Sequence, residues 1–212
     1  VIPTISIELF GVTTNKLLLS PMWRDSDKFL KRPFDLILSS ILIIILIIPM
    51  LFIGFIIKLS SSGSILYWSK RVGINETFFL MPKFRTMKKD TPAVATHLLG
   101  DIDDRLTFFG KILRKTSLDE LPQLFTILKG DMSFVGPRPA LYNQDDLIKL
   151  RREYGIHKLM PGLTGWAQIN GRDSLPIAKK VNFEAEYLDK KSFLFDIKII
   201  FLTFLKAILI KD

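Results

Sequence analysis

Two adjacent carboxylates, Asp119 and Glu120, lie in the stretch KTSLDELPQL, where the pattern predicts the start of a helix. Ser117 and Glu120 fit a capping box, but this start would place Pro122 inside the helix, where its ring is unfavourable. A start with Asp119 as N-cap leaves Pro122 in the first turn, and Gly130 then ends the helix. We prefer the second start. Capping explains Asp119 but gives no role to Glu120 or to the cations around the pair.

Those cations are arginines in loops bounded by glycine or proline. A guanidinium suits phosphate because its planar fork donates two hydrogen bonds at once. Pro137 and Pro139 restrict the backbone around Arg138 and would fix its direction. Mg²⁺ typically takes one or two carboxylates together with substrate phosphate oxygens, so the pattern predicts a diphosphate site with Asp119 and Glu120 as metal ligands. The other candidate phosphate ligands are Arg71, Arg85, Arg114 and Arg172.

The composition narrows the function further. The chain has 212 residues and 48% hydrophobic content, enough for one domain with a core, and its net charge of +9 favours an anionic partner. It has no cysteine and two separated histidines, which argues against disulfides, thiolate nucleophiles and zinc. Walker and Rossmann glycine motifs are missing from the sequence. The aromatic residues lie mainly in apolar segments, so we expect no nucleic-acid partner.

An uncharged segment over residues 36–57 is long enough to cross a bilayer, which takes about 20 apolar residues. Pro49 lies near its middle and should kink the helix. Basic residues flank both ends, and the positive-inside rule then asks for both ends on the cytoplasmic side. We therefore favour a re-entrant membrane helix over residues 28–60, broken at Pro49, with a spanning helix as the alternative. The flanking cations are Lys28, Lys31, Arg32, Lys58, Lys70 and Arg71.

The remaining pattern predicts an α+β, mainly helical, membrane-associated catalytic domain over residues 61–191. Aromatic and β-branched residues predict a small β-hairpin over 64–87 that turns around Gly73. Residues 88–104 are expected to form a loop or a short irregular helix. The apolar, charge-interrupted stretch 192–212 predicts either an interfacial amphipathic helix or a helix packed on the domain core. Residues 1–27 are interpreted as a linker or the tail of an upstream domain.

Several of these stretches together resemble the monotopic phosphoglycosyl transferases, the bacterial sugar transferase family. The resemblance covers about residues 28–210, and its most specific motifs are LDELPQL, GDMSFVGPRP and PGLTGWAQINGR in that order. Further matches are KRPFDLILSS, SKRVG and PKFRTM. From the third motif, Gln168 joins Arg172 among the predicted substrate-binding residues. One departure is that the helix break, often Ser-Pro in the family, is Ile48-Pro49 here, so the bend depends on Pro49 alone.

The resemblance implies transfer of a sugar-1-phosphate from a UDP-sugar to a polyprenyl (undecaprenyl) phosphate, with release of UMP. It implies that Asp119 is the nucleophile of a covalent phosphosugar intermediate, that Glu120 assists, and that Mg²⁺ is required. It also implies substrate binding by Pro137, Arg138 and Pro139. The anchor would enter and leave the cytoplasmic leaflet of the bacterial inner membrane, in contact with membrane lipids. A homodimer is a further possibility for this chain.

Two finer features also follow from the resemblance. The stretch DTPAVATHLLGD (90–101) is similar to a subset of the family associated with N-acetylated amino sugars. Residues 1–27 are similar to the junction with an upstream domain in larger members. Two alternatives remain from the residues themselves. One is a ternary complex in which the acid pair only holds Mg²⁺, and the other is a non-enzymatic membrane module that binds lipid.

Overall fold

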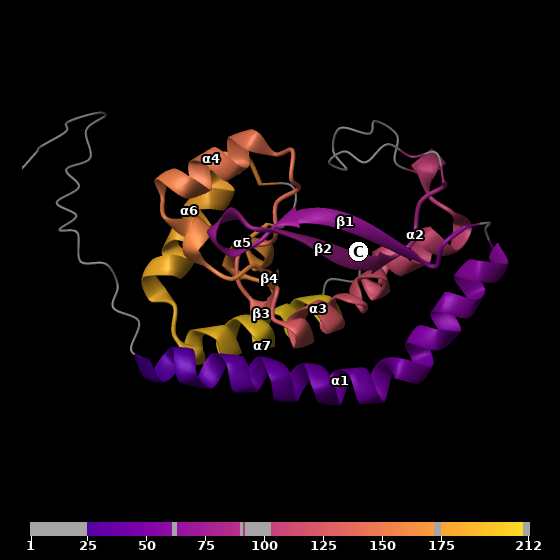
Figure 1. The fold of residues 1–212 in the computed structure, drawn as a ribbon, viewed down its shortest axis with the longest axis horizontal. Coiled ribbons are helices and arrows are strands. Elements are labelled where there is room, and N and C mark those ends of the chain that lie inside the picture. The colour runs from indigo at the N-terminus through magenta and orange to yellow at the C-terminus, as the bar shows by residue number, and fades with distance from the viewer. Residues whose placement is uncertain (1–24, 61–62, 90, 92–102, 172–174, 210–212) are drawn as a thin grey trace, which may run out of the picture.

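The computed structural model describes residues 25–60, 63–89, 91, 103–171 and 175–209. These residues form a mixed, mainly helical fold, which confirms the α+β prediction in its coarse form. A long helix runs along one edge of the molecule, and the other helices and strands lie on one side of it (Figure 1). The division into an anchor, a catalytic domain and a tail stays a prediction.

The long helix is α1 (Asp25–Ser60), which contains both Pro33 and Pro49. The helix is continuous through Pro49, and its ribbon bends in the C-terminal part (Figure 1). The predicted re-entrant break at Pro49 stays a prediction. A proline removes one backbone hydrogen bond, and the neighbouring turns can keep the helix continuous around a kink. Residues Leu30–Ser60 are long and apolar enough to cross a membrane. Whether the helix spans or re-enters stays a prediction.

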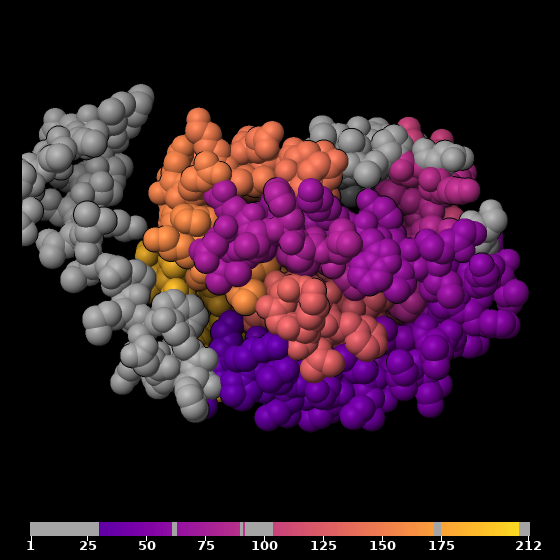
Figure 2. All heavy atoms as spheres, viewed as in Figure 1, coloured from indigo at the N-terminus to yellow at the C-terminus, as the bar shows by residue number. Residues whose placement is uncertain are grey.

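The predicted hairpin is confirmed. Strand β1 (Leu66–Val72) pairs antiparallel with β2 (Phe78–Phe84), and a 3₁₀ turn, η1 (Ile74–Glu76), joins them. Alternation along the strands separates two faces, with Met81 buried on the inner face and Leu80 exposed on the outer one. In the space-filling view the hairpin lies across one face of the molecule, above α3 and α1 (Figure 2).

The segment with the acid pair differs from the predicted single helix. Helix α2 (Phe108–Lys115) leads into a 3₁₀ turn, η4 (Leu118–Glu120), and α3 (Gln123–Lys129) starts only after Pro122. Asp119 is therefore inside the turn η4 and does not cap α3, whose N-cap is Pro122. The residue before η4 is Ser117, whose φ of 57° is left-handed. The predicted stop at Gly130 is confirmed, with φ of 102° and an N–H that bonds back to Thr126 and Ile127.

A second small sheet holds the loop after β3. Strand β3 (Ser133–Val135) pairs in parallel with β4 (Gly162–Thr164). Around it lie four helices and one 3₁₀ turn, and the core is formed by apolar side chains such as Ile127, Met132 and Val181. The surrounding elements are α4 (Asp145–Glu153), η5 (Ile156–Lys158), α5 (Trp166–Ile169), α6 (Ile177–Lys190) and α7 (Phe193–Leu209), whereas the turn η3 (Asp103–Arg105) precedes α2.

Helix α7 has one face on the domain. Ile199 is fully buried in the core, and α7 contacts α1, β3 and β4. Its other side exposes Leu194, Phe201 and Phe204. The packed alternative of the sequence prediction is thus confirmed for one face. The interfacial role stays a prediction, supported by the exposed apolar face.

Candidate active site

Three separate segments meet at the side chain of Glu120, which one of them carries. Lys83, near the end of β2, places Nζ 2.6 Å from Oε1 of Glu120. Arg138, in the loop after β3, places Nη2 2.7 Å from the same oxygen. The turn η4 presents Glu120 to both cations, because the left-handed Ser117 redirects the chain after α2. The acid pair and the GPRP loop (residues 136–139) therefore form one site.

The charges around Glu120 decide its protonation state. Burial by itself raises the pKa of Glu120, but the charges and hydrogen bonds of Arg138 and Lys83 outweigh burial and hold the pKa well below its usual range. Burial also lowers the pKa of Lys83, and the attraction of Glu120 offsets this shift only in part. Glu120 is thus ionised, and it fixes the positions of two cations.

Asp119 has a different environment from its neighbour. Its side chain is buried, with 7% of the residue exposed, and its carboxylate accepts no hydrogen bond from any residue that the structure describes. Burial raises the pKa of Asp119 and the charge of Glu120 adds to this, while Lys83, Arg114 and Arg138 lower it without cancelling the rise. A carboxylate with no fixed donor keeps both oxygens available for bonding to a substrate or a metal.

Hydrogen bonds to its backbone carbonyl oxygens hold the GPRP loop in place. Arg151 donates from Nη2 to the carbonyl oxygen of Arg138 at 2.9 Å, and it forms a buried ion pair with Glu184. Arg71 donates from Nη1 to the carbonyl oxygen of Pro139 at 3.1 Å. The carbonyl of Pro137 accepts from the N–H of Gly162 at 2.9 Å. These contacts fix the backbone on both sides of Arg138.

The remaining residues predicted to bind substrate have different surroundings. Arg114 lies close enough to Asp119 to influence its charge, and its Nε donates to Thr86 Oγ1 at 3.1 Å. The guanidinium of Arg85 approaches Gly63, next to the end of α1. Gln168, on α5, has a buried side-chain amide with no hydrogen-bond partner among the described residues. Arg172 lies outside the described residues. Substrate binding by the predicted arginines and by Gln168 stays a prediction.

Sequence reasoning missed Lys83, Arg151 and Glu184. Lys83 is two residues from the buried Met81, so strand alternation in MPK would have placed both on the inner face. Arg151 and Glu184 lie 33 residues apart on two different helices, and no local pattern connects them.

The donor set fits Mg²⁺ held jointly with a substrate. Within the described residues no three acidic or histidine side chains group together, so these residues by themselves form no closed metal cage. The unbonded carboxylate of Asp119 beside Glu120 supplies the one or two carboxylates that Mg²⁺ takes when phosphate oxygens complete its shell.

Comparisons with known proteins show what this chain is similar to. A profile described as bacterial sugar transferase matches residues 26–209. The chain is 41% identical over 209 residues to the UDP-glucose:undecaprenyl-phosphate glucose-1-phosphate transferase of Escherichia coli, covering 94% of this chain and 44% of that protein. It is 38% identical over 179 residues to the uncharacterized sugar transferase EpsL of Bacillus subtilis, covering 84% and 87% of the two chains.

A third relative is the undecaprenyl-phosphate galactose phosphotransferase of Salmonella typhimurium. It is 36% identical over 203 residues, covering 88% of this chain and 42% of that protein. The chain therefore spans less than half the length of the relatives from Escherichia coli and Salmonella typhimurium, and most of the length of EpsL.

Proposed function

This chain belongs to the bacterial sugar transferase family, and on that premise we propose that it transfers a sugar-1-phosphate from a UDP-sugar to undecaprenyl phosphate and releases UMP. The observation that carries the proposal is the contrast within the acid pair. Glu120 is bonded to two cations, whereas the adjacent Asp119 is buried beside them with no hydrogen bond from the described residues. Such a pair supplies a nucleophile next to fixed positive charge.

The transfer takes place in two displacements. A carboxylate oxygen of Asp119 attacks the β-phosphorus of the UDP-sugar, and the bond to the oxygen that bridges the two phosphorus atoms breaks. UMP leaves with that electron pair, and the sugar phosphate remains bonded to Asp119. A phosphate oxygen of undecaprenyl phosphate then attacks the same phosphorus, which releases the Asp119 carboxylate and forms the lipid-linked diphosphate sugar. A carboxylate nucleophile thus divides one difficult step into two.

Arg138 and Lys83 contribute positive charge where the phosphates bind. Phosphoryl transfer depends mainly on positioning and on neutralising the charge of the phosphate oxygens. Glu120 holds both cations through a single oxygen, so their positions are set before a substrate arrives. Asp119 and Glu120 would hold Mg²⁺ together with the diphosphate, and the ion would supply further charge neutralisation.

The membrane helix α1 would bring the site to undecaprenyl phosphate, the acceptor in the second displacement. The bent, apolar α1 would enter and leave the cytoplasmic leaflet of the bacterial inner membrane. Exposed isoleucines such as Ile44 and Ile48 supply an apolar surface for lipid contact, with 74% and 75% of each residue exposed. The acid pair would then lie near the bilayer surface, where undecaprenyl phosphate presents its phosphate.

The donor is proposed to be a UDP-linked N-acetylated amino sugar, from the stretch 90–101, which lies almost entirely outside the described residues. The names of two relatives specify glucose and galactose, so a test needs a panel of donors. The assay measures UMP released from each donor in vesicles with undecaprenyl phosphate and Mg²⁺. Release that depends on both additions supports the proposed reaction, and release without acceptor, up to one UMP per enzyme, separates the covalent route from a ternary complex. Failure of every donor to yield UMP would overturn the proposal.

A further inference from the structure

The first turns of α1 carry polar side chains that face the catalytic segments. Lys31 and Asp35 are four residues apart, so both lie on one side of the helix. Asp35 is buried, with 4% of the residue exposed, and Lys31 is half-buried. Contact with lipid does not require charged side chains on the side of α1 that faces the domain. Lys31 and Asp35 therefore have another role.

Both side chains bind the backbone of β3. Lys31 donates from Nζ to the carbonyl oxygen of Val135 at 3.0 Å. Asp35 accepts at Oδ1 from the N–H of Phe134 at 3.2 Å. Arg138 follows Val135 by only three residues, so α1 is hydrogen-bonded to the strand that leads to the site arginine.

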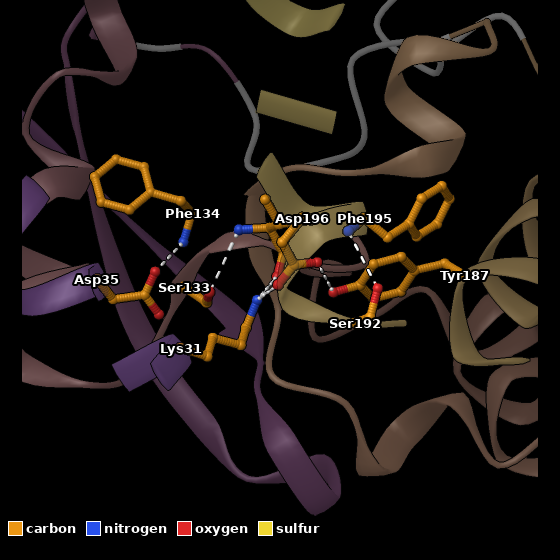
Figure 3. Close-up of polar contacts among 9 residues, drawn as sticks. Lys31, Asp35, Ser133, Phe134, Tyr187, Ser192, Phe195 and Asp196 are labelled. Atoms are coloured by element: carbon orange, nitrogen blue, oxygen red, sulfur yellow. Dashed lines mark hydrogen bonds and ion pairs between the residues drawn. The ribbon is translucent and has the colours of Figure 1, made fainter. Parts of the chain in front are cut away.

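Lys31 is itself held by the C-terminal helix. It pairs with Oδ2 of Asp196 on α7, and the hydroxyl of Tyr187 donates to Oδ1 of Asp196 at 2.7 Å (Figure 3). Asp196 is 6% exposed and Tyr187 is 3% exposed. In the close-up, Lys31 points between β3 and Asp196, with Asp35 on the adjoining turn toward Phe134 (Figure 3). This chain of contacts makes the position of β3 depend on α1, α6 and α7 together.

The same part of α1 also holds the other half of the site. Arg32 donates to the carbonyl oxygens of Ile127 at 2.7 Å and Leu128 at 2.9 Å, at the C-terminal end of α3. The turn that bears Glu120 leads directly into α3. Neighbouring residues of α1 therefore contact the segments that carry both partners of the Glu120–Arg138 ion pair.

We propose that Lys31 and Asp35 are positioning residues. Through β3 they set the position of the GPRP loop, and with it Arg138, relative to Glu120. They thereby couple the position of the membrane helix to catalysis. The inference depends on the proposed transferase function. Residues that act in this way change the rate of the chemical step in molecules that are folded and able to bind donor. Small misplacements of catalytic groups lower rates by large factors.

The test is a time course of UMP release from the identified UDP-sugar, without acceptor, by the full chain in lipid vesicles. The amplitude counts competent molecules and the rate constant reports the geometry of the site. For Lys31→Met we expect a near wild-type amplitude and a rate constant lowered by at least about 10-fold. Lys31→Arg keeps a charged donor and should recover most of the rate. Lys198→Met removes an exposed lysine of α7 and should match wild type.

A lowered amplitude with an unchanged rate constant in Lys31→Met would overturn the inference, because it would show that the contacts only support folding. Should that variant fail to accumulate, Tyr187→Phe removes a single hydrogen bond to Asp196 and carries the same test. A rate constant equal to wild type in Tyr187→Phe would then overturn it. The absence of UMP from wild-type enzyme with every donor, even with undecaprenyl phosphate, would instead count against the proposed function itself.

Discussion

Arg138 donates a hydrogen bond from Nη2 to Oε1 of Glu120 over 2.7 Å and so joins two segments that lie 18 residues apart in the sequence. Lys83 donates to the same oxygen at 2.6 Å. One carboxylate oxygen therefore organises two cations from a strand and a loop, while the adjacent Asp119 stays outside these bonds. The two acids of the pair have separate roles, and substitutions at each should separate them.

The substitution Glu120→Gln keeps the shape of the side chain and removes the charge that fixes Arg138 and Lys83. We expect turnover to fall about 100-fold, the scale seen when one preorganised electrostatic group is lost. The covalent intermediate should still form, slowly, because Asp119 remains. Kinetics of UMP release check this, and Glu76→Gln, in an exposed pair with Arg152, is the matched control. Wild-type turnover in Glu120→Gln would show that the fixed cations do not matter.

The dependence of the rate on pH follows from the shifted pKa values. Burial raises the pKa of Asp119 above its ordinary value of 3.8, so the ionised nucleophile is lost as the pH falls through a value above 3.8. Burial lowers the pKa of Lys83 below its ordinary value of 10.5, so its charge is lost as the pH rises through a value below 10.5. The rate of intermediate formation should therefore be bell-shaped, with both limbs moved inward.

Lys83→Arg tests the alkaline limb, because arginine stays charged at every pH in the assay. We expect this variant to lose the alkaline limb and to keep the acid limb, measured as the rate of UMP release without acceptor between about pH 4 and 10. An alkaline limb that is unchanged in Lys83→Arg would assign it to another group.

Gly136 allows β3 and β4 to approach closely. A Cβ atom at Gly136 would lie 2.2 Å from the carbonyl oxygen of Met160, where backbone cannot give way easily. We expect Gly136→Ala to cost about 2–3 kcal/mol of stability, as overpacking does, and to displace the Arg138 loop. Gly155→Ala meets no atom within 4 Å and should cost only about 1 kcal/mol for its left-handed backbone. Thermal unfolding compares them, and equal midpoints would contradict the close approach.

The topology of α1 can be measured directly, because the chain has no cysteine of its own. Single substitutions Lys28→Cys and Lys58→Cys mark the two ends of the apolar segment. A re-entrant helix predicts that an impermeant thiol reagent labels both only from the cytoplasmic face, in inverted vesicles but not in intact spheroplasts. The cysteine-free parent is the control for background. Labelling of the two ends from opposite faces would show a spanning helix.

Local patterns predicted the parts of the fold that local chemistry determines. Alternation and the turn at Gly73 predicted the hairpin, Gly130 predicted the end of α3, and the apolar run predicted α1. The short parallel pair β3 and β4 was not predicted, because three-residue strands carry no periodicity and pair across 29 residues. Asp119 was expected to cap a helix because sequence shows its type, but not the left-handed turn at Ser117 that carries it into the site.

The candidate site was predicted in its residue types more than in its contacts. The Asp119–Glu120 pair and Arg138 were identified and lie together, whereas Lys83 was missed in favour of Arg85, two residues later. Arg71 was expected to bind phosphate and bonds the carbonyl of Pro139 in this structure. Which side chain reaches which partner depends on packing between distant segments, and a single sequence does not record it.

Intact-protein mass spectrometry, after mixing with Mg²⁺ and a panel of UDP-sugars in the absence of acceptor, is the most direct test of Asp119 as the nucleophile. The predicted result is a mass increase of one phosphosugar with the true donor, present in wild type and lost in Asp119→Asn. No added mass with any donor, while UMP is released once undecaprenyl phosphate is present, would contradict covalent catalysis and leave Asp119 as a metal ligand.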